Sequence, residues 1–321
     1  MSAYRFGPEN PETYVPHAFP EQTVDTGEAI INYAVAGSPD KPALLLIPGQ
    51  TESWWGYEQA LDLLKEHFQA FAIDLRGQGR SSRTPGRYTL DNFGNDMMRF
   101  IALAIKRPLL VSGLSSGGVI TAWLSAYAMP GMVRGAHYED PPLFSSQVSP
   151  SCGHSIRQTI GPIFALMSKY LGDQWSVGNW TGMREALKTE LPDWLANFMA
   201  ATWGASETIP QNLREYDPEW SRAFWEGSVY ASCDHARMLA SVKCPVLYTH
   251  HFRNVDDNRG TLLGAASDLQ VRRVCELVSR AGPPIDYRSF PQMPHSMHGT
   301  DPKLFTELLV EFEAQLRHQN R

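Results

Sequence analysis

The stretch Val111-Ser112-Gly113-Leu114-Ser115-Ser116-Gly117-Gly118 decides the fold. It lies between an apolar run that ends at Val111 and a helix-like run that starts at Val119. A strand, a tight turn with a glycine two residues on either side of a serine, and a helix are the context of a nucleophile elbow. Such a turn is strained and brings backbone segments close together, so residues without a side chain are needed beside the serine. We therefore predict Ser115 as a nucleophile, because Ser116 would need a small residue at Leu114.

Strands and helices alternate on both sides of this stretch. The run 43–47 is apolar throughout, which is typical of a strand covered on both faces of a sheet. The alternation predicts an α/β protein with a mostly parallel central sheet flanked by helices. The other expected strands are 29–37, 69–73, 133–138, 245–250 and 285–290, and the expected helices are 57–68, 91–105, 267–281 and 301–318.

The alternation stops between about residues 143 and 242. Helical spacing of apolar residues continues there without an intervening strand, and Asp217-Pro218 reads as an N-cap followed by a first-turn proline. We therefore expect a helical lid, or cap, inserted into the core domain. The expected organisation is residues 1–142 (with an extended arm at 1–21) and 243–321 as the core and 143–242 as the lid, with lid helices at 155–171, 181–191 and 192–203.

Composition excludes several classes of function. The 321 residues carry a net charge of −6 without a basic block, which argues against nucleic acid or an anionic membrane as a partner. The first twenty residues are polar and proline-rich, and no apolar run reaches membrane-spanning length. Four cysteines without a C-x-x-C pair favour free thiols in a cytoplasmic protein over disulfides or zinc. No pairing surface is readable, and a homodimer stays open.

The chain resembles the α/β-hydrolase superfamily from about residue 22 to its end. The residues that carry the resemblance are Pro48-Gly49-Gln50, Asp74-Leu-Arg-Gly-Gln-Gly-Arg-Ser81, the elbow at Ser115, Asp140-Pro-Pro, and His295 before the last helix. The resemblance implies a core sheet domain, a serine-centred site and no cofactor.

A narrower resemblance is to the bacterial zearalenone hydrolases, which open the macrocyclic lactone of a fungal resorcylic-acid mycotoxin. It rests on Tyr88-Thr-Leu-Asp-Asn-Phe-Gly-Asn-Asp96, Ala122-Trp-Leu-Ser-Ala-Tyr-Ala-Met-Pro130, Leu171-Gly-Asp-Gln-Trp-Ser176, Glu215-Tyr-Asp-Pro-Glu-Trp220 and Leu262-Leu-Gly-Ala-Ala-Ser-Asp-Leu-Gln270. The chain departs from that family at Leu114, where a polar residue is usual, and in the middle of the lid. The resemblance implies an apolar ester or lactone as the small-molecule substrate.

A serine nucleophile needs a base, and ten histidines compete for this role. His295 lies in the loop after the last expected strand, where an imidazole can be carried over the elbow. His298 is the rival, three residues further along. Two histidines at this spacing could also bind a metal, but no neighbouring carboxylate or cysteine completes a ligand set. We therefore predict His295 as the base and no metal site.

The acid that orients the base has more than one candidate. Asp256 and Asp257 follow the strand 245–250, the usual place for this residue, whereas Glu139 and Asp140 end the preceding strand. The narrower resemblance favours the later loop, because its His-His-x-Arg-x-x-Asp pattern reads here as His250-His251-Phe-Arg253-Asn-Val-Asp256. Asp256 is therefore the predicted acid, and Asp257, Glu139 and Asp140 are the alternatives. His250 and His251 are expected in the core or behind the site.

An oxyanion hole needs two backbone N–H groups aimed at one point. One belongs to the residue after the nucleophile, Ser116, and the other comes from the loop after strand 43–47, which indicates Gln50. The glycine-rich segment 74–81 lacks a P-loop lysine and is interpreted as a structural turn.

Aromatic and methionine side chains are frequent in the expected lid. Most are expected in its core, and a minority could face the elbow, since a cleft of methionine and aromatic side chains suits a large apolar ligand. They are Met167, Trp175, Trp180, Met183, Trp194, Phe198, Met199, Trp203, Trp220 and Phe224.

The sequence therefore predicts a serine hydrolase that cleaves an ester or lactone through an acyl-enzyme, with zearalenone or a close analogue as substrate. A generalist carboxylesterase is the alternative within the hydrolases. A hydrolase-fold protein that binds an apolar ligand with little turnover is the alternative from another class.

Overall fold

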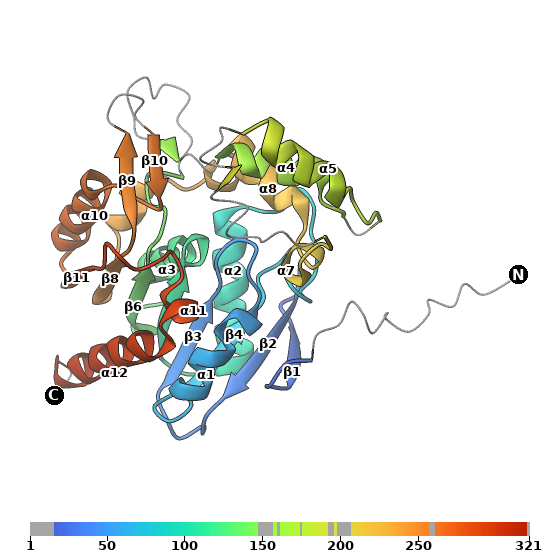
Figure 1. Ribbon diagram of the computed structural model, residues 1–321. Coiled ribbons are helices and arrows are strands. Elements are labelled where there is room, and N and C mark those ends of the chain that lie inside the picture. The colour runs from blue at the N-terminus through green and yellow to red at the C-terminus, as the bar shows by residue number, and fades with distance from the viewer. Residues whose placement is uncertain are drawn as a thin grey trace, which may run out of the picture.

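The computed structural model describes residues 16–146, 157–158, 161–173, 175–191, 196–197, 207–256 and 261–319. Its centre is an eight-stranded sheet of order β1-β2-β4-β3-β5-β6-β8-β11 (Figure 1). β2 is antiparallel to β1 and β4, and all other neighbours are parallel. The predicted α/β architecture is confirmed. The bounds are β1 Glu21–Asp25, β2 Ile30–Ala36, β3 Ala43–Ile47, β4 Gln69–Ile73, β5 Leu109–Leu114, β6 Val133–Glu139, β8 Val246–His250 and β11 Ile285–Ser289.

Helices cover both faces of this sheet. All five residues of β3 are buried, and alternate side chains enter different hydrophobic clusters, with Leu44 and Leu46 on one side and Leu45 and Ile47 on the other. The first cluster is closed by α1 (Glu58–Leu64) and α12 (Pro302–Gln319), and the second by α2 (Leu90–Phe100), α3 (Ser116–Tyr127) and α10 (Asp268–Ala281). A strand with period-two side chains between two apolar layers explains the unbroken apolar run.

Local sequence signals set the ends of the helices that pack on the sheet. Ser267 caps α10 through a reciprocal capping box with Gln270, and the helix ends at Gly282, as predicted. Thr89 caps α2 by accepting a hydrogen bond from the Asn92 amide. The predicted helix 91–105 is α2 followed by one π-helical turn, η3 (Ile101–Ile105).

Between β6 and β8 the described residues are mainly helical, and we call residues 143–242 the insertion. Figure 1 shows α4, α5 and α8 side by side at one end of the sheet. The division of the chain at 143 and 242 stays a prediction. The elements of the insertion are β7 Arg157–Gln158, α4 Gly161–Tyr170, α5 Trp180–Thr189, α7 Gln211–Arg214, α8 Pro218–Glu226, η4 Ser228–Tyr230 and α9 His235–Leu239.

A second, smaller sheet corrects the expectation of an insertion without strands. β7 pairs in parallel with β10 (Thr261–Gly264), which is antiparallel to β9 (Arg253–Asp256). The predicted helix 155–171 is therefore wrong at its start, where the backbone of β7 pairs with β10 instead. The predicted helix 192–203 and the N-terminal arm lie largely outside the described residues.

The apolar residues expected in the lid divide into three groups. Met167, Met183, Trp220 and Phe224 are buried in the main core and Trp180 packs against it, which confirms a structural role for these five. Trp175 is 85% exposed. The remaining residues of the set, Trp194, Phe198, Met199 and Trp203, lie outside the described residues.

Two further sequence expectations concern cysteines and membranes. Cys233, Cys244 and Cys275 are free, whereas Cys152 lies outside the described residues. Within the described part of the chain, no helix has the length and apolar character needed to cross a bilayer.

The elbow glycine Gly117 yields a stability prediction. A Cβ atom at Gly117 would lie 2.3 Å from the Ile47 carbonyl oxygen, so neighbouring backbone would have to move. We expect Gly117→Ala to lower the free energy of unfolding by at least about 1–3 kcal/mol, the usual range for overpacking. Denaturant unfolding measures this change. Gly56→Ala is the control, because no atom lies within 4 Å of a Cβ there; equal stability of the two variants would contradict the tight turn.

Candidate active site

The turn between β5 and α3 holds Ser115 in a strained conformation. Its φ is 55° and its ψ −121°, a region that residues other than glycine rarely adopt. The Ser115 amide donates to the Glu139 carbonyl oxygen at 2.9 Å. A Cβ at Gly113 would meet the Gly117 carbonyl oxygen at 2.3 Å, so both flanking glycines are needed sterically. The predicted elbow geometry is confirmed.

His295 lies in the loop between β11 and the short helix α11 (Met297–Thr300). Its Nδ1 forms a hydrogen bond of 2.7 Å with Oδ2 of Asp140. The Asp140 side chain is 1% exposed and that of His295 48% exposed, so the carboxylate is buried behind a more accessible imidazole. This arrangement leaves Nε2 as the ring nitrogen that can exchange a proton with a substrate-side group.

The predicted pairing of His295 with Asp256 is corrected to Asp140. Asp256 ends β9, and its backbone is paired with Thr261 in the smaller sheet. Asp140 follows β6, a direct neighbour of β5 in the main sheet, and it therefore emerges beside the elbow. Its positive φ of 42° turns the chain at this point. The alternative Asp257 lies outside the described residues.

Charge and hydrogen bonding shift the pKa values of this pair in opposite directions. Burial raises the pKa of Asp140, but the hydrogen bond and positive charge of His295, together with the hydrogen bond from the His251 backbone N–H, hold it below its ordinary value. Burial lowers the pKa of His295, but Asp140 and the charges of Glu52 and Glu139 outweigh burial and raise it. The geometry therefore favours a carboxylate next to an imidazole that binds protons readily.

His298, the rival base, belongs to a second buried pair. Its Nδ1 lies 3.1 Å from Glu139 Oε2, and both side chains are almost completely buried. Glu139 Oε1 also accepts hydrogen bonds from the amides of Met297 and His298, at 2.8 and 3.1 Å. Burial lowers the pKa of His298, but the charge of Glu139 and its hydrogen bond raise it overall. His298 therefore anchors the loop that carries His295 and is not placed as the base.

The two predicted oxyanion donors lie at adjacent turns. Ser116 is the first residue of α3, and Gln50 follows β3. In the described part of the chain, neither backbone N–H donates a hydrogen bond, so both are free to bind an oxyanion. The Gln50 side chain is engaged elsewhere, since its Nε2 donates to Tyr216 Oη in the insertion at 2.6 Å.

Ser115 and His295 are not yet hydrogen-bonded to each other. Among the described residues, no hydrogen bond joins Ser115 Oγ to His295 Nε2. Such contacts are often long in free hydrolases and shorten when substrate is bound. The two residues lie at the same carboxyl-terminal edge of the sheet, since β5, β6, β8 and β11 run parallel.

The segment 74–81 is a structural turn, as predicted. Asp74 accepts hydrogen bonds from Asn32 Nδ2 and from the amides of Trp54 and Arg80. Burial raises the pKa of Asp74 to about 7. The residues that the sequence reasoning missed are Glu52, which accepts from the Gly49 amide at 3.1 Å, and Tyr216. In the sequence, Glu52 is indicated only by its position two residues after Gln50, and Tyr216 only by lying in the segment 215–220 that carries the narrower resemblance.

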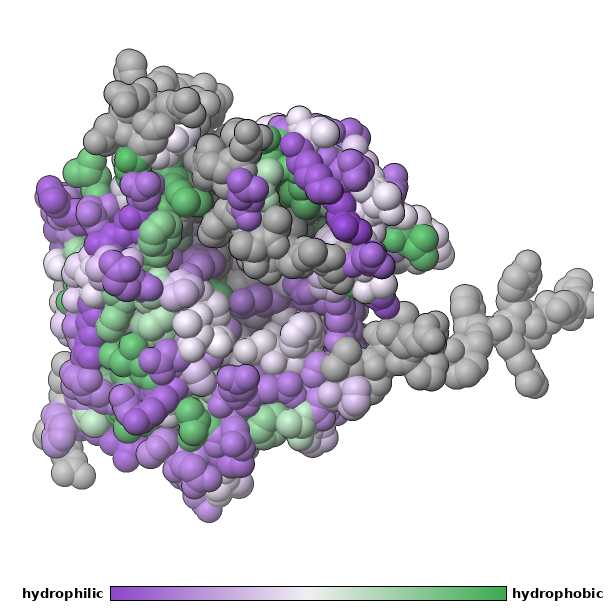
Figure 2. Space-filling model, in the orientation of Figure 1, coloured by the Kyte–Doolittle hydropathy of each residue, from purple (hydrophilic) through white to green (hydrophobic). Residues whose placement is uncertain are grey.

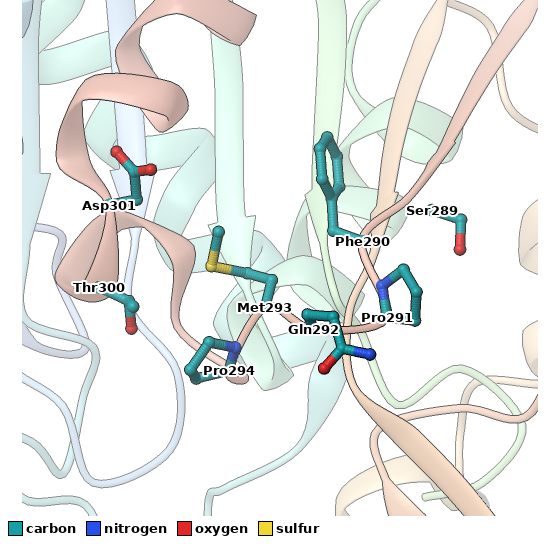
Figure 3. A pocket seen from close by; sticks show the side chains of 8 residues that line it. All are labelled: Ser289, Phe290, Pro291, Gln292, Met293, Pro294, Thr300 and Asp301. Carbon is teal, nitrogen blue, oxygen red and sulfur yellow. The ribbon is translucent and has the colours of Figure 1, made fainter.

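The face of the molecule seen in Figure 2 has a recess near its centre, and hydrophilic residues are prominent around it. A separate hollow lies beside the loop after β11 (Figure 3), and its lining includes neither Ser115 nor Asp140 nor His295. Its lining residues are Ser289, Phe290, Pro291, Gln292, Met293, Pro294, Thr300 and Asp301. Within the described ranges no group of three histidine, cysteine or acidic side chains is arranged to hold a metal ion.

The family model of the alpha/beta hydrolase fold matches residues 42–237, more than half of the chain. The chain belongs to the α/β-hydrolase family. This membership agrees with the sheet order, the strained Ser115 turn and the His295–Asp140 pair described above.

Curated relatives match this α/β-hydrolase over about a third of its length. A 3-oxoadipate enol-lactonase 2 from Acinetobacter baylyi is 28% identical over 109 residues, which are 33% of this chain and 40% of the lactonase. The human epoxide hydrolase 4 is 34% identical over 105 residues, 32% of this chain and 28% of that protein. The matches thus span less than half the length of either relative.

Solved structures share the fold over nearly the whole hydrolase. The enol-lactonase from Burkholderia xenovorans LB400 superposes with a TM-score of 0.64 and 15% identity, covering 91% of this chain and 100% of that one. The esterase RhEst1 from Rhodococcus sp. ECU1013 gives a TM-score of 0.60 and 19% identity, covering 93% and 99%. At these identities the likeness establishes the fold alone.

The Asp140–His295 pair predicts which acid matters. We expect Asp140→Asn to lower kcat for a p-nitrophenyl ester about 1,000- to 10,000-fold, because an amide can no longer stabilise the required imidazole tautomer. Asp256→Asn is the matched control and should retain activity within about threefold, as is usual for a substitution away from the reacting groups. Loss of activity in Asp256→Asn together with an active Asp140→Asn would overturn this assignment.

The raised pKa of His295 predicts the pH dependence of hydrolysis. A general base works only when neutral, so kcat/KM should fall as the pH drops through the pKa of His295. Because that pKa lies above its ordinary value of 6.5, the acid limb should have its midpoint above pH 6.5. A pH–rate profile with a p-nitrophenyl ester measures this midpoint, and a midpoint at or below the ordinary value would contradict the effect of the nearby carboxylates.

Proposed function

We propose that this chain is a serine hydrolase that opens an ester bond of a large apolar lactone, zearalenone or a close analogue, through an acyl-enzyme. The observation that carries the reaction is the strained Ser115 turn beside the buried Asp140–His295 pair. The substrate rests on the resemblance of five segments of the chain to the zearalenone hydrolases. We further infer that the insertion 143–242 is the lid of the site, and that the three free cysteines fit a reducing compartment such as the cytoplasm.

The first half of the reaction forms the acyl-enzyme. Ser115 Oγ attacks the lactone carbonyl carbon while His295 Nε2 takes its proton, and Asp140 stabilises the resulting imidazolium through Nδ1. The amides of Gln50 and Ser116 donate to the oxyanion of the tetrahedral intermediate. Each such donor is worth about 2.7–4 kcal/mol in comparable enzymes. The intermediate collapses as the ring C–O bond breaks and His295 gives its proton to the leaving oxygen.

The second half of the reaction releases the acid. The leaving hydroxyl of a lactone stays tethered to the acyl group, so prompt protonation by His295 is needed to prevent reclosure. Water then attacks the acyl carbon, with His295 as its base, and Ser115 regains its proton. The same groups therefore serve both halves, and no cofactor is required.

Aromatic residues of the insertion lie behind the loop that carries Gln50. Tyr216 lies beside the oxyanion loop, held by Gln50, and it packs with Trp220 at a ring-centroid distance of 6.0 Å. Both rings are completely buried, so they fix the position of this loop and do not themselves contact a substrate. A generalist carboxylesterase would use the same machinery on acyclic esters.

Hydrolysis of zearalenone by the purified protein tests the proposal. We expect chromatography to show the ring-opened acid, and Ser115→Ala to reduce its formation at least about 10,000-fold, because the nucleophile is lost. Asp256→Asn is the control, because it makes the same chemical change in the smaller sheet and should leave turnover nearly unchanged. p-Nitrophenyl butyrate is measured in parallel.

The outcomes separate the alternatives. Turnover of p-nitrophenyl butyrate with an unchanged lactone would indicate the generalist esterase. Tight binding of zearalenone without turnover of either compound would indicate a ligand-binding protein. Undiminished turnover by Ser115→Ala would overturn the acyl-enzyme mechanism itself.

A further inference from the structure

A chain of buried polar side chains crosses the sheet behind the site. Ser112 Oγ lies 2.9 Å from His137 Nδ1, and His137 Nε2 lies 3.1 Å from Thr249 Oγ1. Thr249 Oγ1 lies 3.2 Å from His251 Nε2, and His251 Nδ1 lies 2.9 Å from the His295 carbonyl oxygen. The side chains come from β5, β6, β8 and the residue after β8. Those of Ser112, His137, Thr249 and His251 are completely buried.

The end at His295 determines where the protons lie. A carbonyl oxygen only accepts, so His251 Nδ1 carries a proton. If His251 is neutral, its Nε2 accepts from the Thr249 hydroxyl. That hydroxyl has a single proton, so His137 Nε2 must donate to Thr249, and Ser112 must donate to His137 Nδ1. This one arrangement of protons gives every polar atom of these four side chains a hydrogen-bond partner while both imidazoles are neutral.

A charged His251 would reverse the direction of the hydrogen bonds between these side chains. Its Nε2 would donate to Thr249, the Thr249 hydroxyl would donate to His137 Nε2, and the His137 proton would move to Nδ1. Among the described residues no carboxylate forms an ion pair with the His251 ring, since Asp140 and Glu139 are paired with His295 and His298. Burial also lowers the pKa of His137 to about 4, so His137 is neutral and its tautomer reports the direction of the chain.

His251 contacts both members of the acid–base pair. Its backbone N–H donates to Asp140 Oδ1 at 3.1 Å, while Asp140 Oδ2 bonds His295 Nδ1 at 2.7 Å. Its ring holds the His295 backbone from the other side. Asp140, His251 and His295 therefore form a closed ring of hydrogen bonds, and the ring closes only when His251 presents a proton at Nδ1.

We propose that His251 is a positioning residue for His295, held as the neutral Nδ1–H tautomer by the chain Ser112–His137–Thr249. This inference rests on the proposed function only in its kinetic test, which measures ester hydrolysis. Misplacement of a reacting group by about 1 Å can cost about 100-fold in rate. The loss should appear in kcat and leave KM nearly unchanged, because His251 does not face the substrate.

Two matched pairs of variants test the kinetic part. His251→Leu should lower kcat for p-nitrophenyl butyrate about 10- to 100-fold, and His251→Asn, whose amide can donate near the Nδ1 position, should recover most of the loss. Thr249→Val removes the hydroxyl at equal volume and should behave like His251→Leu, whereas Thr249→Ser should behave like the wild type. Equal kcat in all four folded variants, or a loss confined to KM, would overturn the proposal.

The tautomers are tested without any substrate. In protein labelled with 15N-histidine, two-bond 15N–1H correlations at pH 7.5 should show His251 protonated at Nδ1 and His137 at Nε2. Thr249→Val should remove this preference and shift the proton of the His295–Asp140 hydrogen bond, and Thr249→Ser should preserve both. A His137 protonated at Nδ1, or a His251 protonated at both nitrogens, would overturn the proposal even if the protein hydrolyses esters. Correct tautomers in a protein that hydrolyses no ester would sustain the arrangement and reject only the proposed function.

Discussion

The carboxyl-terminal end of β6 is the constraint on which the site depends. The Glu139 carbonyl oxygen accepts the Ser115 amide, the Glu139 carboxylate accepts two amides of α11, and the next residue, Asp140, binds the His295 ring. Two consecutive residues thus position the Ser115 turn, the His295 ring and the loop that carries His295. Strained conformations at Ser115 and Asp140, each costing about 1–3 kcal/mol, persist because these contacts leave the backbone no alternative. A change in this strand end would move all three parts together.

Placing two carboxylates side by side in the interior carries an electrostatic cost. Glu139 and Asp140 are almost completely buried, and each faces its own imidazole, His298 and His295. An isolated buried charge is far more costly than a paired one, and removing one partner of a buried pair typically costs about 3–5 kcal/mol. The two pairs differ in exposure, since His298 is 1% exposed and His295 48%. The deeper pair therefore serves as an anchor, and the accessible one retains a ring nitrogen for chemistry.

The parts of the site that depend on local geometry could be predicted from the sequence. Glycines two residues from Ser115 indicated a strained turn because only they fit there, and His295 was found because it follows the last strand. The acid could not be decided, since Asp140 and Asp256 both follow a strand and only the pairing of β9 with β10 shows that Asp256 belongs to the smaller sheet. The short strands β7, β9 and β10 were missed because two to four residues carry no periodicity, and because β7 pairs with a strand that is distant in the sequence.

The loop after β3, which carries the predicted oxyanion donor Gln50, lies between the buried Glu139–His298 pair and the insertion. The side-chain amide of Gln50 is bonded to Tyr216 Oη, which is bonded to Ser221 Oγ of α8 at 2.8 Å. On its other side, Glu52 accepts from the Gly49 amide and lies 3.8 Å from His298 Nε2. The turn that presents the Gln50 N–H is thus joined by hydrogen bonds to the insertion on one side, and Glu52 brings it close to His298 on the other. Hydrogen bonds of a single loop therefore connect the insertion to the predicted oxyanion donor Gln50.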